Sequence, residues 1–153
     1  METNIAHRRK RKKGEVFIDK REGKSFHPVN LAFVGDAVYE QYVRRHLVLR
    51  HRRKRSGELH RMCVQYVRAG AQAEIVDGLK DEWTEEEFFI YRRGRNAATK
   101  SVPKNTEIQV YKKATGFEAL IGYLFLTGNQ VRLEEVVEEA ILLVEQKESR
   151  EIR

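Results

Sequence analysis

The sequence has 153 residues, enough for one domain with a buried core, and its 41% hydrophobic content excludes a disordered chain. Its 30 Lys and Arg residues exceed 23 Asp and Glu residues, and the net charge of +7 favours a polyanionic partner, either nucleic acid or an acidic membrane surface. One cysteine, Cys63, excludes an internal disulfide, and no apolar stretch approaches the roughly 20 residues that span a bilayer, so we expect a cytoplasmic protein that is not a membrane protein.

Residues 1–27 are predicted to form a basic flexible arm followed by a linker. An unbroken basic run covers residues 8–13, and its six cations outweigh Glu2 to give the first 13 residues a charge of +5. Contact with phosphate groups and simple solvation are both open for this arm. Gly and Ser among charges in residues 14–27 are typical of a linker.

A folded domain is predicted over residues 28–148, with residues 149–153 as a C-terminal tail. Pro28 suits the first turn of a helix. Apolar residues then recur at helical spacing from Leu31 to Leu49, which predicts a long first helix that ends in a basic loop.

The rest of the domain also reads as helical. Thr84 and Glu87 form a capping box at the start of one helix, and Gly128 followed by Asn129 is a plausible stop for a later one. No alternating strand pattern interrupts the series, so we expect an all-α helical bundle. The later helices are expected over residues 56–68, 71–79, 84–94, 106–127 and 131–147.

Two acidic residues stand where the helical pattern calls for apolar ones. Asp36 lies within LAFVGDAVYE, and Glu118 lies within GFEALIGYLFL, a run that is apolar on nearly all sides. A carboxylate is rarely buried without a partner. Either each acid pairs with an arginine, or the two together hold a metal ion such as Mg²⁺, which prefers hard oxygen ligands. Glu40 shares a face with Asp36, and it either supports the metal site from behind Asp36 or pairs with Arg44, of which we favour the ion pair.

Two basic segments contain no acidic residue. Residues 44–55 carry seven cations, and a solvated face is the simplest interpretation of them. Residues 92–104 mix their cations with Asn96 and Ser101, a combination typical of contacts to phosphate and sugar groups. The second segment also directly precedes the helix with Glu118, which favours a role beside the two acids.

At these residues the chain resembles the ribonuclease III family. The signature helix of that family is similar to LAFVGDAVYE, and its second acid-bearing helix is similar to ATGFEALIGYLFL. The segment GRNAATKSVPKN resembles the one typical of the compact bacterial branch, Mini-ribonuclease III. Full-length ribonuclease III has further acids where this chain has Ala32 and Thr115, and the compact branch shares both losses. The resemblance runs from about Pro28 to the last helix.

The resemblance implies a ribonuclease III-like endonuclease domain that acts as a homodimer on double-stranded RNA. It implies that Asp36 and Glu118 are the catalytic residues and the ligands of Mg²⁺. It also implies that Phe33 packs at the dimer interface, although packing within its own subunit is the simpler alternative. The usual role of the compact branch is maturation of the large-subunit (23S) ribosomal RNA precursor.

Metal-assisted hydrolysis that leaves 5′-phosphate and 3′-hydroxyl ends is therefore the functional hypothesis. The alternative is a non-catalytic module for double-stranded-RNA binding or ribosome assembly, because two family acids are absent. A DNA-binding or membrane-surface protein is a weaker alternative, since it leaves the two acids unexplained. The residues expected to contact the RNA backbone are Arg92, Arg93, Arg95, Asn96, Lys100 and Lys104.

Overall fold

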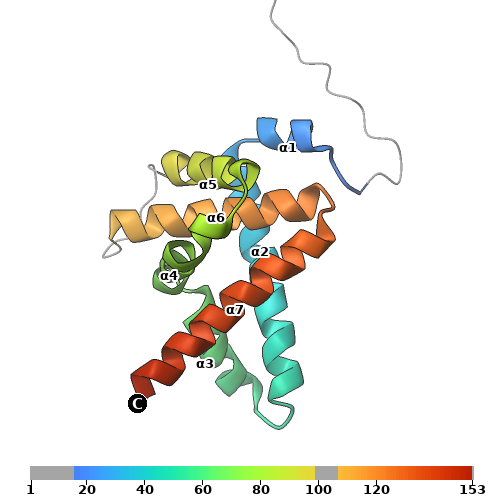
Figure 1. Cartoon of the computed structure of the whole chain (residues 1–153). Helices are drawn as coiled ribbons and strands as arrows, with labels where there is room; N and C mark the ends of the chain where they lie inside the picture. Colours follow the sequence, from blue (N-terminus) through green and yellow to red (C-terminus); the bar gives the residue numbers. More distant parts are fainter. Residues whose placement is uncertain (1–15, 99–106, 153) are drawn as a thin grey trace, which may run out of the picture.

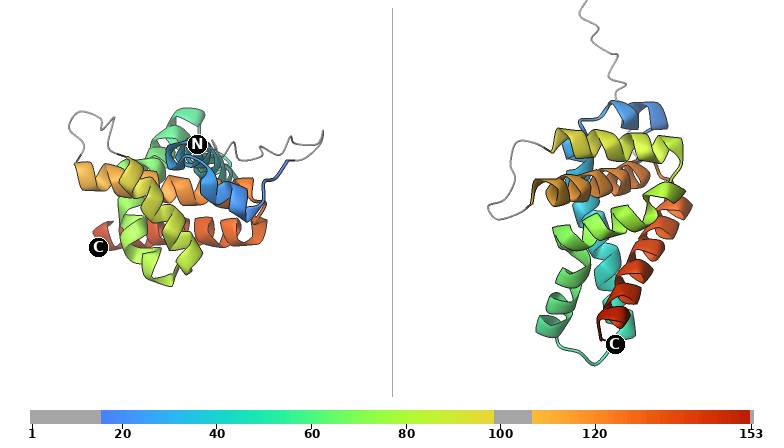
Figure 2. Two further views of the ribbon diagram at one scale, coloured as in Figure 1. Left: turned by 90° about the horizontal axis from the view of Figure 1, so that it is seen from above. Right: turned by 60° about the vertical axis from the view of Figure 1, so that its left-hand side comes forward.

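The computed structural model describes residues 16–98 and 107–152, and every regular element within them is a helix, which confirms the all-α prediction. Helix α6 lies across α2, with α5 and α4 on opposite sides of it and α7 running diagonally over the bundle (Figure 1, Figure 2). None of these helices is both long and apolar enough to cross a membrane. The helices are α1 (Lys20–Ser25), α2 (Pro28–Arg50), α3 (Ser56–Val67), α4 (Ala69–Leu79), the short 3-10 helix η1 (Lys80–Glu82), α5 (Glu85–Ala97), α6 (Ile108–Leu126) and α7 (Gln130–Ile152).

Helix α6 is the centre of the hydrophobic core. Phe117, Leu120 and Ile121 have no exposed surface, and Leu124 is also buried. Tyr39 of α2 packs edge-on against Phe117, with 5.1 Å between the ring centroids. Because α2, α4 and α5 all contact α6, apolar residues are needed on nearly every side of it, which is the pattern seen in the sequence.

Helices α2 and α6 cross in direct backbone contact, which requires glycine on both helices. A Cβ atom added at Gly35 would lie 1.7 Å from the carbonyl oxygen of Glu118. A Cβ atom added at Gly122 would lie 1.9 Å from the carbonyl oxygen of Leu31. No side chain fits at such distances. The crossing therefore sets the spacing between α6 and the residue after Gly35, which is Asp36.

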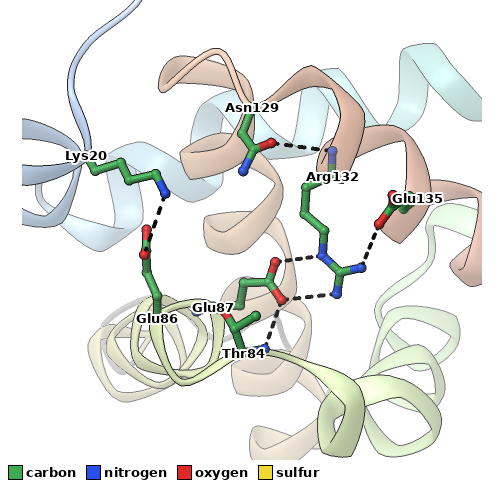
Figure 3. Close-up of polar contacts among 7 residues, drawn as sticks. All are labelled: Lys20, Thr84, Glu86, Glu87, Asn129, Arg132 and Glu135. Carbon is green, nitrogen blue, oxygen red and sulfur yellow. Dashed lines mark hydrogen bonds and ion pairs between the residues drawn. The ribbon is translucent and has the colours of Figure 1, made fainter.

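The start of α5 is joined to α7 through the buried carboxylate of Glu87. The predicted capping box is present: the Glu87 amide donates to Thr84 Oγ1 at 3.1 Å, and the Thr84 amide donates to Glu87 Oε1 at 3.0 Å. Arg132 of α7 donates from Nε to Glu87 Oε2 at 2.8 Å and from Nη2 to Oε1 at 3.1 Å (Figure 3). A two-point pair of this kind is among the stronger polar contacts in proteins.

Residues 16–27, interpreted from the sequence as a linker, pack against the body and contain α1. Ile18 is buried, and its amide donates to the carbonyl oxygen of Leu126 at 2.8 Å. Arg93 of α5 donates to the carbonyl oxygen of Phe26 at 3.4 Å. Phe26 also packs against the core, and Lys20 pairs with Glu86 at 3.9 Å. These contacts join segments far apart in the chain, so no local periodic pattern reveals them.

Several helix boundaries differ from the prediction. Helix α4 (Ala69–Leu79) begins before the expected residue 71, and Gln72 Nε2 donates to the carbonyl oxygen of Val67 at 2.9 Å across its junction with α3. Helix α5 (Glu85–Ala97) continues beyond its expected end at residue 94. Helix α7 continues through residues 149–152, where a tail was expected. No Gly or Pro is present there to end the helix.

Candidate functional site

The two acids that break the helical pattern meet beside the crossing of α2 and α6. Asp36 is on α2 and is exposed, whereas Glu118 is on α6 and is partly buried. Their side chains share a hydrogen bond. Two carboxyl groups in contact repel each other when both are ionised, so a proton or a cation shared between them is favoured.

Burial raises the pKa of Glu118 to about 8, and both the negative charge of Asp36 and the hydrogen bond between the two side chains add to the rise. The acid pair therefore retains a proton near neutral pH when no cation is bound. A bound cation would reverse this effect, because its positive charge favours the ionised form of both groups. A carboxyl group with a pKa shifted in this way is more common at functional sites than elsewhere.

A cleft of about 380 Å³ opens at the acid pair, and helices α2, α4 and α6 together with the end of α3 form its walls. This volume lies within the range of small-ligand sites. Residues from distant parts of the sequence converge on it. Besides the two acids, the lining includes Phe33 of α2, Gln72 of α4, and Tyr111 and Thr115 of α6.

The alternative in which each acid pairs with an arginine finds no support in residues 16–98 and 107–152. None of the ion pairs formed there involves Asp36 or Glu118. Glu40 instead pairs with Arg44 at 3.7 Å, as its spacing predicts. Within the described residues, therefore, no basic side chain neutralises either acid of the cleft.

The polar groups of the cleft fit a hydrated divalent metal. Mg²⁺ usually takes one or two protein carboxylates and keeps several waters. Among the described residues no third His, Cys, Asp or Glu joins Asp36 and Glu118 in a metal-binding group. Thr115 donates its hydroxyl to the carbonyl oxygen of Tyr111 at 3.1 Å. The buried amide oxygen of Gln72 has no hydrogen-bond partner there, so the lining still has an acceptor to offer to a water shell.

The last turns of α5 carry part of the predicted RNA-contact set. Arg92 is exposed. The guanidinium group of Arg95 lies 5.6 Å from the centre of the Tyr91 ring, and its Nε donates to Asn96 Oδ1 at 3.3 Å. The stacking on Tyr91 restricts the Arg95 side chain, so a phosphate contact there would cost less conformational entropy.

The other cations of that set are placed differently. Arg93 donates to the carbonyl oxygens of Lys24 and Phe26 and so holds the end of α1 against α5. This structural bond uses a donor that the sequence analysis assigned to RNA. Lys100 and Lys104 lie outside the described residues.

Phe33 is the most exposed large aromatic residue at the cleft, with 81% of its surface accessible. Packing within its own subunit therefore does not account for it. Val29, one helical turn earlier on α2, lines the same cleft and is 40% exposed. The rim of the acid cleft is thus apolar on the α2 side.

Two of the lining residues with polar side chains, Gln72 and Tyr111, were not predicted from the sequence. Gln72 lies between the buried Ala71 and Ala73 on α4, and a polar residue on that apolar stretch was the available signal. Tyr111 could not be singled out, because a tyrosine near the start of a largely apolar helix is ordinary. Only the packing of α6 brings it to the cleft.

Known proteins match the chain in sequence and in fold. A family model described as Ribonuclease III domain matches residues 29–129. A Mini-ribonuclease 3 of Thermoanaerobacter sp. is 45% identical over 122 residues, which cover 80% of this chain and 85% of the relative. A Mini-ribonuclease 3 of Clostridium tetani is 38% identical over 138 residues, which cover 90% of this chain and 91% of the relative. A crystal structure of a protein from Fusobacterium nucleatum has a TM-score of 0.70 and 26% identity, and the match covers 76% of this chain and 93% of that one.

The matching fold and sequence together define an endoribonuclease. The chain belongs to the ribonuclease III family, in its Mini-ribonuclease III branch. The family resemblance found in the sequence is thereby confirmed, as is the prediction of an enzyme rather than a non-catalytic module.

Proposed function

We propose that this endoribonuclease hydrolyses double-stranded RNA with Mg²⁺ held by Asp36 and Glu118. The observation that carries the proposal is the convergence of two carboxylates in one cleft, without a cationic partner among the described residues. Members of the ribonuclease III family act on double-stranded RNA and generally depend on a divalent metal. Mg²⁺ suits this cleft because carboxylate oxygens are its preferred protein ligands.

The two acids have distinct surroundings that suit them to hold one ion. Asp36 is exposed and reaches solvent and substrate, whereas Glu118 is partly buried, where attraction to a cation is less screened by water. The backbone contact at Gly35 fixes their spacing before substrate binds. The bound metal would supply an activated water and neutralise charge on the phosphate. Hydrolysis by this route leaves 5′-phosphate and 3′-hydroxyl ends.

Cleavage of a synthetic RNA duplex tests the proposal directly. We expect wild-type protein to cut the duplex in Mg²⁺ and to stop in EDTA. Asp36→Asn and Glu118→Gln should abolish cleavage and retain RNA binding, because each removes a metal ligand and no cation. Asp81→Asn, an exposed acid on η1, is the matched control and should cut at the wild-type rate. Full activity of either cleft variant would disprove the assignment.

We further propose that the natural substrate is the 23S ribosomal RNA precursor and that the enzyme works in the cytoplasm. An RNA duplex hides its bases in a deep major groove, so recognition depends mainly on shape and backbone. Incubation with a transcript of the precursor and with a generic duplex of equal length would test this. Defined ends in the precursor are expected, and equal, unspecific cutting of both would argue against a dedicated substrate.

The RNA-backbone contacts are proposed at Arg92, Arg95, Asn96, Lys100 and Lys104, and at Arg93 through the guanidinium nitrogens other than Nη1, which holds α1. Each cation that neutralises a phosphate contributes close to one unit to the slope of log binding constant against log salt concentration. We expect Arg92→Ala and Arg95→Ala each to reduce the slope by about one. Arg53→Ala, from the other basic segment, is the control that should leave it unchanged. An equal slope in all variants would show that α5 makes no such contact.

A homodimer completes the proposal, with one site in each subunit and Phe33 at the interface. It is supported by the exposure of Phe33 and Val29 at the rim of the cleft, since apolar side chains gain free energy when covered. Two sites on one assembly would allow both strands of a duplex to be cut.

A further inference from the structure

Gln72 is a buried polar side chain with part of its hydrogen-bonding capacity unused. It lies on α4 with 2% of its surface exposed. Its Nε2 donates to the carbonyl oxygen of Val67 at 2.9 Å. Its Oε1 has no hydrogen-bond partner among the residues that the structure describes. Two other buried side-chain atoms of those residues, His46 Nε2 and Trp83 Nε1, also lack a hydrogen bond, but neither residue lines the acid cleft.

The bond to Val67 fixes the orientation of the amide group. A carbonyl oxygen only accepts, so the nitrogen of Gln72 must face the end of α3 and the oxygen must point away from it. A buried amide oxygen without a partner lowers the stability of the fold. Gln72 lines the same cleft as Asp36 and Glu118, so a donor bound in that cleft is the partner within its reach.

Water held by a metal is such a donor. Mg²⁺ gives up its waters reluctantly and keeps several of them when the protein supplies only two carboxylates. The hydrogens of those waters need acceptors, and outer acceptors orient the inner shell. The hydroxyl of Thr115 is already committed to the Tyr111 carbonyl. An amide oxygen accepts hydrogen bonds without adding a third negative charge beside Asp36 and Glu118.

We propose that Oε1 of Gln72 accepts a hydrogen bond from a metal-bound water in the acid cleft, which makes Gln72 a positioning residue of the nuclease. The inference rests on the proposed metal site and adds a third helix, α4, to the two that carry its ligands. It gives a neutral oxygen to a site where Ala32 and Thr115 supply no further carboxylate.

A purely structural role for Gln72 would act through its other end, the Nε2 bond that closes α3. Two substitutions separate the roles. Gln72→Met is of similar size and removes both the donor and the acceptor. Gln72→Glu keeps an acceptor oxygen and, when ionised, loses the donor to Val67. If only the donor matters, both variants should be destabilised alike and should bind metal as the wild type does.

The test is direct Mn²⁺ binding to the full-length protein without RNA, read from the electron paramagnetic resonance signal of free Mn²⁺. We expect Gln72→Met to weaken binding by roughly ten-fold or more, in line with outer-shell partners at other metal sites. Gln72→Glu should bind at least as tightly as the wild type. Gln65→Met, an exposed glutamine on α3, is the control and should not change the affinity. All titrations are run below the melting temperature of every variant.

The outcomes separate this inference from the proposed function. Unchanged Mn²⁺ affinity in Gln72→Met, with Asp36→Asn weakened, would overturn the role of Gln72 and leave the metal site standing. Weaker binding in folded Gln72→Glu would also overturn it, and this variant decides the matter if Gln72→Met does not fold. Equal binding by wild type and Asp36→Asn would overturn the metal site and the inference with it.

Discussion

Glu118 carries a carboxyl group whose ionisation is opposed by the fold. Its pKa rises from 4.5 to about 8 through burial and through the charge and hydrogen bond of Asp36. Below the pKa of the unfolded chain, Glu118 is protonated in both the folded and the unfolded state, and its ionisation does not reduce the stability. As the pH rises toward the pKa of the folded chain, Glu118 ionises in the unfolded chain but stays protonated in the folded one. Stability contributed by the protonated group is therefore lost between these two pKa values.

We predict that the metal-free protein becomes less stable as pH rises from about 5 to about 8, and that Glu118→Gln lacks this component. The gap in melting temperature between variant and wild type, measured in EDTA, should widen across that range. Saturating Mg²⁺ should stabilise the wild type most at the upper end, where the ligand is readily deprotonated. If the melting temperatures of the two proteins in EDTA changed with pH in the same way, a raised pKa at Glu118 would be ruled out.

The sequence predicted the charged residues of the site better than the neutral ones. Asp36 and Glu118 could be singled out from the sequence because a charge inside an apolar helix has a large energetic cost. Gln72 was not, since one uncharged polar residue in a helix breaks no strong rule. The bond of Arg93 to α1 was also invisible, because it joins segments far apart in the chain.

At the scale of elements, the crossing of α2 and α6 depends on two glycines. We predict that Gly35→Ala or Gly122→Ala lowers stability by at least the roughly 1–3 kcal/mol of an overpacked core, because each methyl group would meet backbone that cannot yield. Cleavage should fall as well, since the acids move apart with the helices. The measurements are denaturant unfolding and duplex cleavage on the same samples.

Gly57→Ala is the matched control for these substitutions. Gly57 lies in α3, and the nearest atom to an added Cβ is the end of the flexible Arg61 side chain at 3.8 Å. Alanine is a better helix former than glycine by about 1 kcal/mol, so this variant should be unchanged or more stable. If Gly35→Ala behaved in the same way, the close crossing would not exist in solution.

The link between α5 and α7 gives a second prediction about elements. Burial alone would raise the pKa of Glu87, but the hydrogen bonds from Arg132 and Thr84 outweigh it and lower the pKa. A lowered pKa contributes stability that is present above the unfolded value of 4.5 and lost as pH falls. Arg132→Met should cost roughly 3 kcal/mol at neutral pH, because it leaves a buried charge with fewer partners.

The cost of Arg132→Met should shrink in acid as Glu87 becomes protonated, which urea unfolding at several pH values would reveal. Arg150→Met, an exposed arginine on the same helix, should stay within about 0.5 kcal/mol of the wild type. A loss that is constant across pH would show that packing rather than charge explains the role of Arg132.

Most of the helices followed from sequence periodicity, and the helix ends followed only where a local capping motif marked them. The capping box at Thr84 and the stop at Gly128, which has φ of 71°, were predictable because they depend on local backbone chemistry. Helix α1 was missed because it is short and is held by tertiary contacts such as the Ile18 amide bond to Leu126. Sequence patterns therefore predict the elements that local interactions determine, and they do not predict those that depend on tertiary contacts.

At the scale of the whole molecule, we predict a dimer that depends on Phe33. Light scattering should give twice the chain mass of 18.0 kDa for the wild type. Phe33→Asp should give a folded monomer that cuts duplex RNA poorly, because a charge at an apolar contact is costly to bury. Val131→Asp is the control, since Val131 is 72% exposed on α7 and should leave the mass unchanged. A monomeric wild type would refute the assembly.

The contact between Gly35 and the α6 backbone also has a mechanical meaning. When two helices that are in contact at their crossing change their crossing angle, residues near the crossing move least and the helix ends move most. Asp36 and Glu118 sit at the pivot of α2 and α6. Bending of the bundle would therefore displace the helix ends most and would change the spacing of these two carboxylates least.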